Sequence, residues 1–140
     1  MLTSTRGPDP RKLQDKDFLN ASIKTLVSYL VDHNYDQAIS PKIMKQPSSK
    51  DYHSIIFFLF RQIDPNYECI GTKLEPDEIL AFYRQLGYQH PPSKANIAAA
   101  GTPHAWPSLL AGLVWLVELL TYDEQAAPSM MGQVWSIYTH

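Results

Sequence analysis

The chain has 140 residues, of which 44% are hydrophobic and 19% charged, a composition that suits one domain with a substantial core and excludes wholesale disorder. The net charge of −2 argues against a general nucleic-acid binder, and no apolar run is long enough to span a bilayer, so neither nucleic acid nor membrane is expected as a partner. The single cysteine, Cys69, excludes a disulfide framework and favours a reducing intracellular compartment.

Charge is unevenly distributed along the chain. Residues 1–50 hold 8 basic and 5 acidic side chains, whereas residues 51–140 hold 4 basic and 9 acidic ones. A local basic patch and a uniformly mixed surface are both consistent with this distribution.

The first predicted helix follows a short lead-in. Residues 1–14 contain Gly7, Pro8 and Pro10 without periodicity, and they read as a flexible lead-in or the remnant of a tail, with no apolar core that would indicate a signal peptide. From Asp15 to about Asn34 the apolar residues share one helical face. They are Leu19, Ile23, Leu26, Val27 and Leu30. A short helical turn is expected within residues 36–47.

The middle of the chain has clear helix boundaries. Ser48 and Asp51 have the spacing of a capping box, which predicts a helix from about Lys50 to Ile63 rather than a strand. After a loop at 64–74, the segment EPDEILAFYRQLG (75–87) begins with a first-turn proline and ends at a glycine, as helices commonly do. A short helix is predicted from Lys94 to Ala100.

The last large helix is expected to run from Pro107 to about Tyr122. It is apolar on nearly every face, which is typical of the central helix of a bundle, and Trp106 and Trp115 are predicted core anchors. Residues 123–140 are interpreted as a linker and a short amphipathic helix. Its stripe is a candidate partner surface, formed by Met131, Val134, Trp135 and Tyr138. The fold class is therefore all-α, with about five to seven helices.

Motifs for catalysis, metals or cofactors are missing from the sequence. The five histidines form no metal-binding pair, and the glycines form no phosphate-binding loop. No acid, base and nucleophile occur together in a recognisable pattern, so the chain is predicted to be neither an enzyme nor a metal or cofactor binder. Taken by itself, His104 between two prolines is expected to cap or pack.

Five phrases in a fixed order carry a family resemblance. They are DPRKLQDKDF (9–18), MKQPSSKDY (44–52), DPNYE (64–68), LGY (86–88) and GTPHAWPSLLAGLVWLVE (101–118). Together, across residues 9–122, they closely resemble the globular head of the HEC/NDC (nuclear-division-cycle) outer-kinetochore family. The last phrase is the most specific, because its proline–histidine turn leads directly into an apolar helix.

The resemblance implies a calponin-homology domain over residues 15–122. It implies a non-enzymatic head that binds microtubules, pairs with a sister calponin-homology subunit as a heterodimer, and acts at the centromeric kinetochore in the nucleus during chromosome segregation. The chain lacks coiled-coil heptads and is expected to be a head fragment of such a protein. The family's basic tail, which is a second, phosphorylation-tuned contact, is expected to be mostly absent, with at most residues 1–8 belonging to it.

The same resemblance assigns microtubule-facing residues one by one. The best matches are Lys16 in the DK pair, Lys94 in the SK pair and His104 in the PH-x-W turn. Lys42 and Lys50 match supporting positions, and Lys45 lies in the same region. Because the outer surface of tubulin is acidic, a lysine-rich face would attract it even on a chain of net negative charge.

Two alternatives remain open from the sequence. One is a structural or adaptor module that mainly docks a sister subunit or a regulator, and the other is an actin-binding calponin-homology module. The first differs from the leading hypothesis in not binding microtubules. The second is disfavoured because the chain has no tandem copy of the domain.

Overall fold

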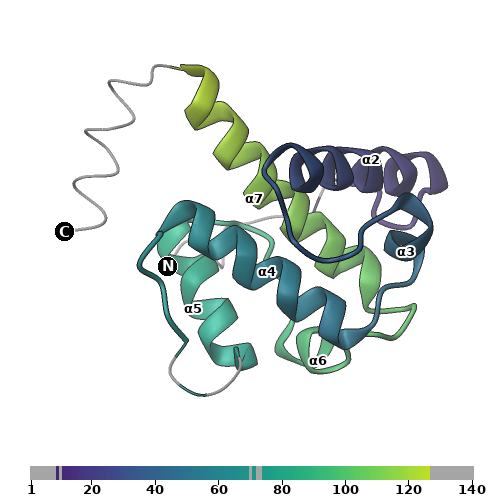
Figure 1. The fold of residues 1–140 in the computed structure, drawn as a ribbon. Helices are drawn as coiled ribbons and strands as arrows, with labels where there is room; N and C mark the ends of the chain where they lie inside the picture. The colour runs from purple at the N-terminus through teal and green to yellow at the C-terminus, as the bar shows by residue number, and fades with distance from the viewer. Residues whose placement is uncertain (1–8, 10, 70, 72–73, 127–140) are drawn as a thin grey trace.

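The computed structural model describes residues 9, 11–69, 71 and 74–126. The described chain is all-α and calponin-homology-like, with six helices and no strand in these ranges (Figure 1). The helices are α2 (Lys16–Asp32), α3 (Pro41–Lys45), α4 (Ser49–Ile63), α5 (Pro76–Leu86), α6 (Lys94–Ala98) and α7 (Trp106–Ala126). The number of helices agrees with the expected five to seven.

The helix ends follow the capping signals in the sequence. Asp15 caps α2 by accepting hydrogen bonds from the backbone N–H groups of Asp17 and Phe18. Ser48 and Asp51 form the expected reciprocal capping box at the start of α4. Gly87 ends α5 at φ +83°, a left-handed conformation that favours glycine.

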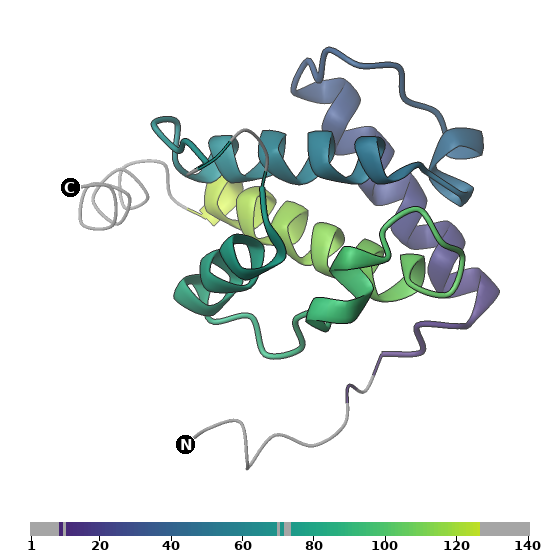
Figure 2. The same cartoon turned by 90° about the horizontal axis from the view of Figure 1, so that it is seen from below.

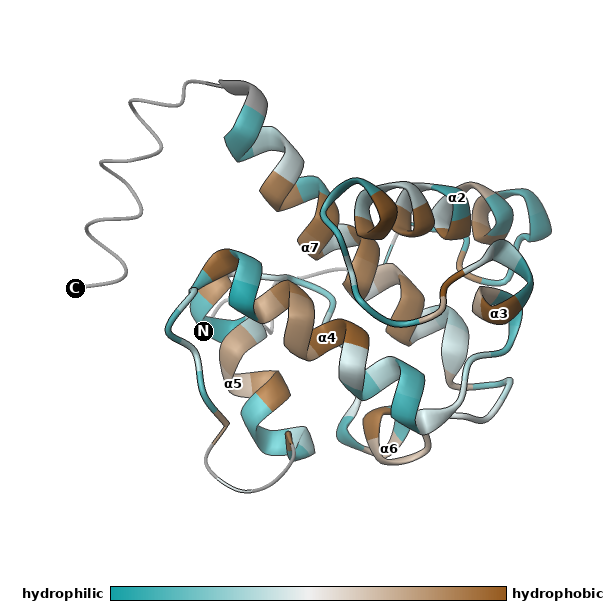
Figure 3. Cartoon of the chain, in the orientation of Figure 1, coloured by the Kyte–Doolittle hydropathy of each residue, from teal (hydrophilic) through white to brown (hydrophobic). Residues whose placement is uncertain are grey.

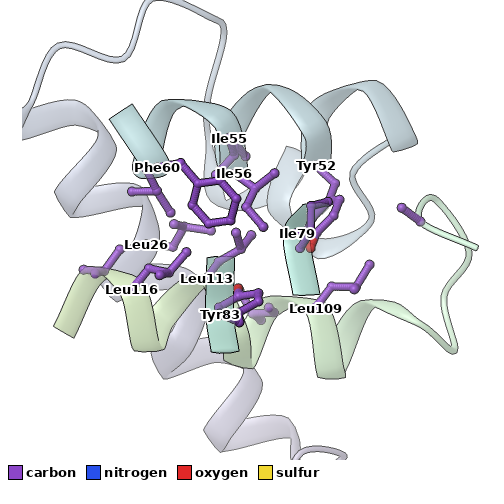
Figure 4. Packing of buried hydrophobic residues seen from close by; sticks show 14 of the residues in the cluster. Leu26, Tyr52, Ile55, Ile56, Phe60, Ile79, Tyr83, Leu109, Leu113 and Leu116 are labelled. Carbon is purple, nitrogen blue, oxygen red and sulfur yellow. The ribbon is translucent and has the colours of Figure 1, made fainter. Parts of the chain in front are cut away.

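The core is built around α7, which packs against α2, α4 and α6. This helix is hydrophobic along most of its length (Figure 3). Its apolar residues cover nearly every face because other helices pack on several sides of it. Phe60 of α4 and Phe82 of α5 stack with ring centroids 3.8 Å apart. Leu113 and Leu116 of α7 are fully buried below α4 (Figure 4).

The observed helices are close to the predicted ones, with differences at their ends. The expected helix Lys94–Ala100 stops at Ala98, and its last residues pass into a turn before Gly101. The final helix starts one residue before Pro107 and continues past Tyr122 to Ala126. The predicted amphipathic stripe at residues 131–138 lies outside the described residues.

Arg11 holds the start of the described chain against the helical body. Its guanidinium pairs with the Asp9 carboxylate at 2.6 Å and donates a hydrogen bond to the Tyr88 hydroxyl at 2.7 Å. It also reaches the carbonyl oxygen of Ala111 in α7, at 3.5 Å. The hydrogen bond from Arg11 holds the pKa of Asp9 below its ordinary value. This part of the expected flexible lead-in therefore rests on the domain.

Candidate partner-binding surface

Four elements meet at one end of the molecule. The starts of α2, α4 and α7 and the short helix α3 lie at the same end in Figure 1 and in the view turned by 90° in Figure 2. In this region α2 packs on α3 and α7. Two further contacts join α7 to α3 and the turn before α7 to α4. The indole N–H of Trp106 donates to the carbonyl oxygen of Met44 at 2.7 Å, and Gly101 lies so close to α4 that an added Cβ would be 3.1 Å from the Ser49 nitrogen.

Four of the predicted contact lysines belong to this end. Lys16 is the first residue of α2, Lys42 and Lys45 are on α3, and Lys50 is the second residue of α4. All four side chains are exposed. Within the described residues none of them takes part in an ion pair. We call these four residues the lysine-bearing end.

Two of these lysines occupy positions that are electrostatically unfavourable for their own helices. Lys16 and Lys50 stand in the first turns of α2 and α4, where the backbone N–H groups already carry partial positive charge. A lysine there costs about 0.3–1 kcal/mol of helix stability relative to a favourable acidic residue. Positions that break a local rule of this kind are often functional ones.

The nearby carboxylates are engaged with the backbone. Asp15 accepts hydrogen bonds from two N–H groups of α2, and Asp51 accepts one from the backbone N–H of Ser48 at 3.0 Å. With Asp17 in the first turn of α2, these helix starts carry three acids against the four lysines, a surplus of 4 − 3 = +1. The exposed helix starts add further partial positive charge, so this end favours an acidic partner.

Lys94 differs from the other predicted lysines because it has a partner. It is the first residue of α6, and its ammonium lies 3.2 Å from each carboxylate oxygen of Asp77 in α5. Both side chains are exposed, so the pair is weak. The sequence gave no signal for this contact, because the two residues lie 17 positions apart in the chain.

The turn before α7 divides into an exposed and a buried part. Pro103 and His104 are exposed, whereas Ala105, Trp106 and Pro107 are buried. The buried part fixes the start of α7. The exposed part leaves the His104 side chain on the surface.

The two predicted core anchors differ in depth. Trp106 is only 6% exposed and is hydrogen-bonded to Met44, which joins α7 to α3. Trp115 is partly buried and stacks on Tyr88, with ring centroids 4.6 Å apart.

Two other described histidines and the cysteine are partly buried and contact neighbouring residues. His33 contacts Glu124 at 3.0 Å, His53 contacts the carbonyl oxygen of Ser49 at 2.8 Å, and the Cys69 thiol donates to the Gly71 carbonyl. In the described ranges no group of His, Cys, Asp or Glu has the arrangement of a metal site. None of the helices in that part of the chain has the length and apolar character that crossing a bilayer needs.

The chain is similar to a known protein family. The model of the HEC/Ndc80p family matches residues 17–131. A mouse protein named kinetochore protein NDC80 homolog is 35% identical over 137 residues, which cover 95% of this chain and 21% of that protein. The Xenopus laevis protein of the same name is 40% identical over 110 residues, covering 79% of this chain and 17% of its own length.

The similarity extends to fungi. A Candida albicans protein named probable kinetochore protein NDC80 is 35% identical over 117 residues, or 79% of this chain and 15% of that protein. The chain thus spans about one fifth, or less, of the length of these relatives.

Proposed function

The chain belongs to the HEC/Ndc80p family, and from this premise we propose that it is a microtubule-binding head that uses the lysine-bearing end. In this proposal it works without catalysis, at the kinetochore of chromosomes in the nucleus, and serves chromosome segregation in mitosis. Its partners are tubulin and a sister calponin-homology subunit. The names of the mouse and frog relatives support the kinetochore assignment.

One observation carries the proposal. The four residues of the lysine-bearing end are exposed and take part in no ion pair within the described residues. Two of them, Lys16 and Lys50, disfavour the helices whose first turns they occupy. Helix stability does not explain lysine at these positions, because an acidic residue stabilises a helix start better. Attraction to an acidic surface provides the compensating benefit.

In this proposal the affinity for a microtubule depends on several weak contacts. An exposed ion pair contributes about 0–1 kcal/mol, so one head binds weakly and its binding falls with salt. Several linked heads bind far more tightly than one, because each later contact forms at a high effective concentration.

The test is cosedimentation with microtubules at low and moderate salt. We compare the wild type with the double variant Lys16→Glu/Lys50→Glu and with Lys24→Glu, which changes an exposed lysine in the middle of α2. The double variant is expected to bind about tenfold more weakly, since two attractions become repulsions. Its melting temperature should be unchanged or higher, because glutamate suits a helix start.

The control separates the local effect from net charge. Lys24→Glu alters the chain by half the charge of the double variant and should change binding by less than about twofold. Equal losses in both variants would mean that net charge alone matters and that the lysine-bearing end is not the contact. Failure of the wild type to bind even at high concentration would favour the adaptor alternative.

A further inference from the structure

The connection between α2 and α3 carries a serine in an unusual setting. Ser40 precedes Pro41 and Lys42 and lies immediately before the lysines of α3. We propose that Ser40 accepts phosphate from a proline-directed serine/threonine kinase, and that the phosphate weakens the attraction of the lysine-bearing end for an acidic partner. The second part rests on the proposed function, whereas the first does not.

The backbone at Ser40 already has the extended conformation in which a kinase active site binds its peptide substrate. Ser40 is extended at φ −162° and ψ 160°, as expected for a residue before proline. Residues 36–39 make no backbone hydrogen bond with any other described residue. Residues 36–38 can therefore leave the surface without losing a backbone hydrogen bond, whereas Ile39 packs against the core and the Ser40 carbonyl accepts the Met44 N–H of α3 at 3.0 Å.

The Ser40 side chain is half-buried and caps the start of α3. Its Oγ accepts one hydrogen bond, from the backbone N–H of Ile43 at 3.2 Å. Pro41 and Lys42, which follow it, are exposed. A kinase that requires proline after the acceptor and favours a nearby basic residue can reach all three positions.

A second dipeptide of the same kind provides an internal comparison. Thr102 also precedes a proline, Pro103, but its hydroxyl donates to the Ala99 carbonyl at 2.7 Å and its backbone N–H bonds to the same oxygen. This threonine lies in a tight turn, and His104 rather than a lysine stands two residues later. The geometry therefore favours Ser40 over Thr102, although both satisfy the simplest sequence rule.

The transfer itself is ordinary phosphoryl chemistry. The Ser40 Oγ forms a bond to the γ-phosphorus of ATP, the bond to the ADP oxygen breaks, and the hydroxyl proton passes to the kinase and then to water. The product carries about −1.5 to −2 charge at pH 7. Set against the four lysines of this end, that charge offsets about half of their positive charge.

The experiment has two readouts on the 140-residue chain. First, wild type, Ser40→Ala and Pro41→Ala are incubated with a purified proline-directed kinase and ATP, and phosphate is located by mass spectrometry. Phosphate is expected at Ser40 in the wild type alone, at least about tenfold above Thr102. Circular dichroism and thermal melting confirm that both variants are folded.

The second readout is microtubule cosedimentation of the phosphorylated and untreated wild-type chains. We expect phosphorylation to weaken binding about three- to tenfold at low salt and less at moderate salt. Absence of phosphate at Ser40, or a preference for Thr102, would overturn the assignment of the acceptor. Phosphate at Ser40 with unchanged binding would overturn its effect on the surface, and an untreated chain that does not bind would overturn that effect together with the proposed function.

Discussion

At the scale of single residues, the ion pair between Lys94 and Asp77 determines how available this lysine is. The ammonium bridges both carboxylate oxygens at 3.2 Å, and both side chains are exposed to solvent. A partner must compete with Asp77 for this charge, although the pair is worth only about 0–1 kcal/mol. Asp77 thus lowers the contribution of Lys94 to the binding of any acidic surface.

Asp77→Asn should therefore raise the affinity for microtubules by up to about threefold at low salt. The change removes the competing carboxylate and leaves Lys94 with its full charge. A matched control is Asp32→Asn, which makes the same substitution at the end of α2, far along the helix from Lys16. If the two variants bind equally, net charge accounts for the effect and the pair has no specific role.

Gly112 is a second residue whose identity is set by one neighbour. A Cβ added there would lie 2.5 Å from the Tyr83 hydroxyl oxygen, and Tyr83 is fully buried. Gly112→Ala should lower the free energy of unfolding by about 1–3 kcal/mol, because the packed tyrosine has no room to move. Urea denaturation measures the change. Gly71→Ala is the control, since a Cβ at Gly71 meets nothing within 4 Å, and a comparable loss there would contradict the steric explanation.

At the scale of elements, Trp106 couples the start of α7 to α3. Its indole N–H donates to the Met44 carbonyl at 2.7 Å, and the indole is almost fully buried. The bond matters because α3 has only five residues and needs tertiary contacts to stay in place. The position of Lys42 and Lys45 depends on it.

Trp106→Phe should cost about 1–3 kcal/mol of stability and should loosen α3 more than α4. Phenylalanine retains most of the apolar contact but leaves the Met44 carbonyl without its donor. Amide hydrogen exchange at residues 43–46 reports the local loosening. Trp115→Phe is the matched aromatic change on a partly buried ring, and equal exchange at α3 in both variants would rule out the coupling.

The elements also show what could be predicted from sequence. The capping box of Ser48 and Asp51, and the glycine at position 87, marked helix ends correctly because such signals act within one turn. The ion pair of Lys94 with Asp77 and the contact of Arg11 with Tyr88 were not predicted, because each joins residues far apart in the chain. The resemblance supplied the candidate lysines, but the common end at which four of their helix segments lie depends on the packing of α2, α3, α4 and α7.

At the scale of the whole molecule, tyrosines are a large part of the core. The chain has eight of them, and within the described residues the buried hydroxyls of Tyr29, Tyr52 and Tyr83 have no hydrogen-bond partner. Burial raises the pKa of all three above the ordinary value of 10, because a tyrosinate would lose its hydration in the core. The fold is thus stable only while these groups keep their protons.

The expected consequence is alkaline unfolding. Because the folded-state pKa lies above the unfolded one, the stabilisation is fully present below pH 10 and is lost as the pH rises above it, when only the unfolded chain releases these protons. The melting temperature should be level from pH 7 to 9 and fall above pH 10, with tyrosinate absorbance rising together with the loss of helix. Tyr83→Phe removes one such group and an unpaired hydroxyl, so its melting temperature should fall less steeply. Full ionisation of the tyrosines in a chain that stays helical would show that the core is open to hydroxide and contradict the prediction.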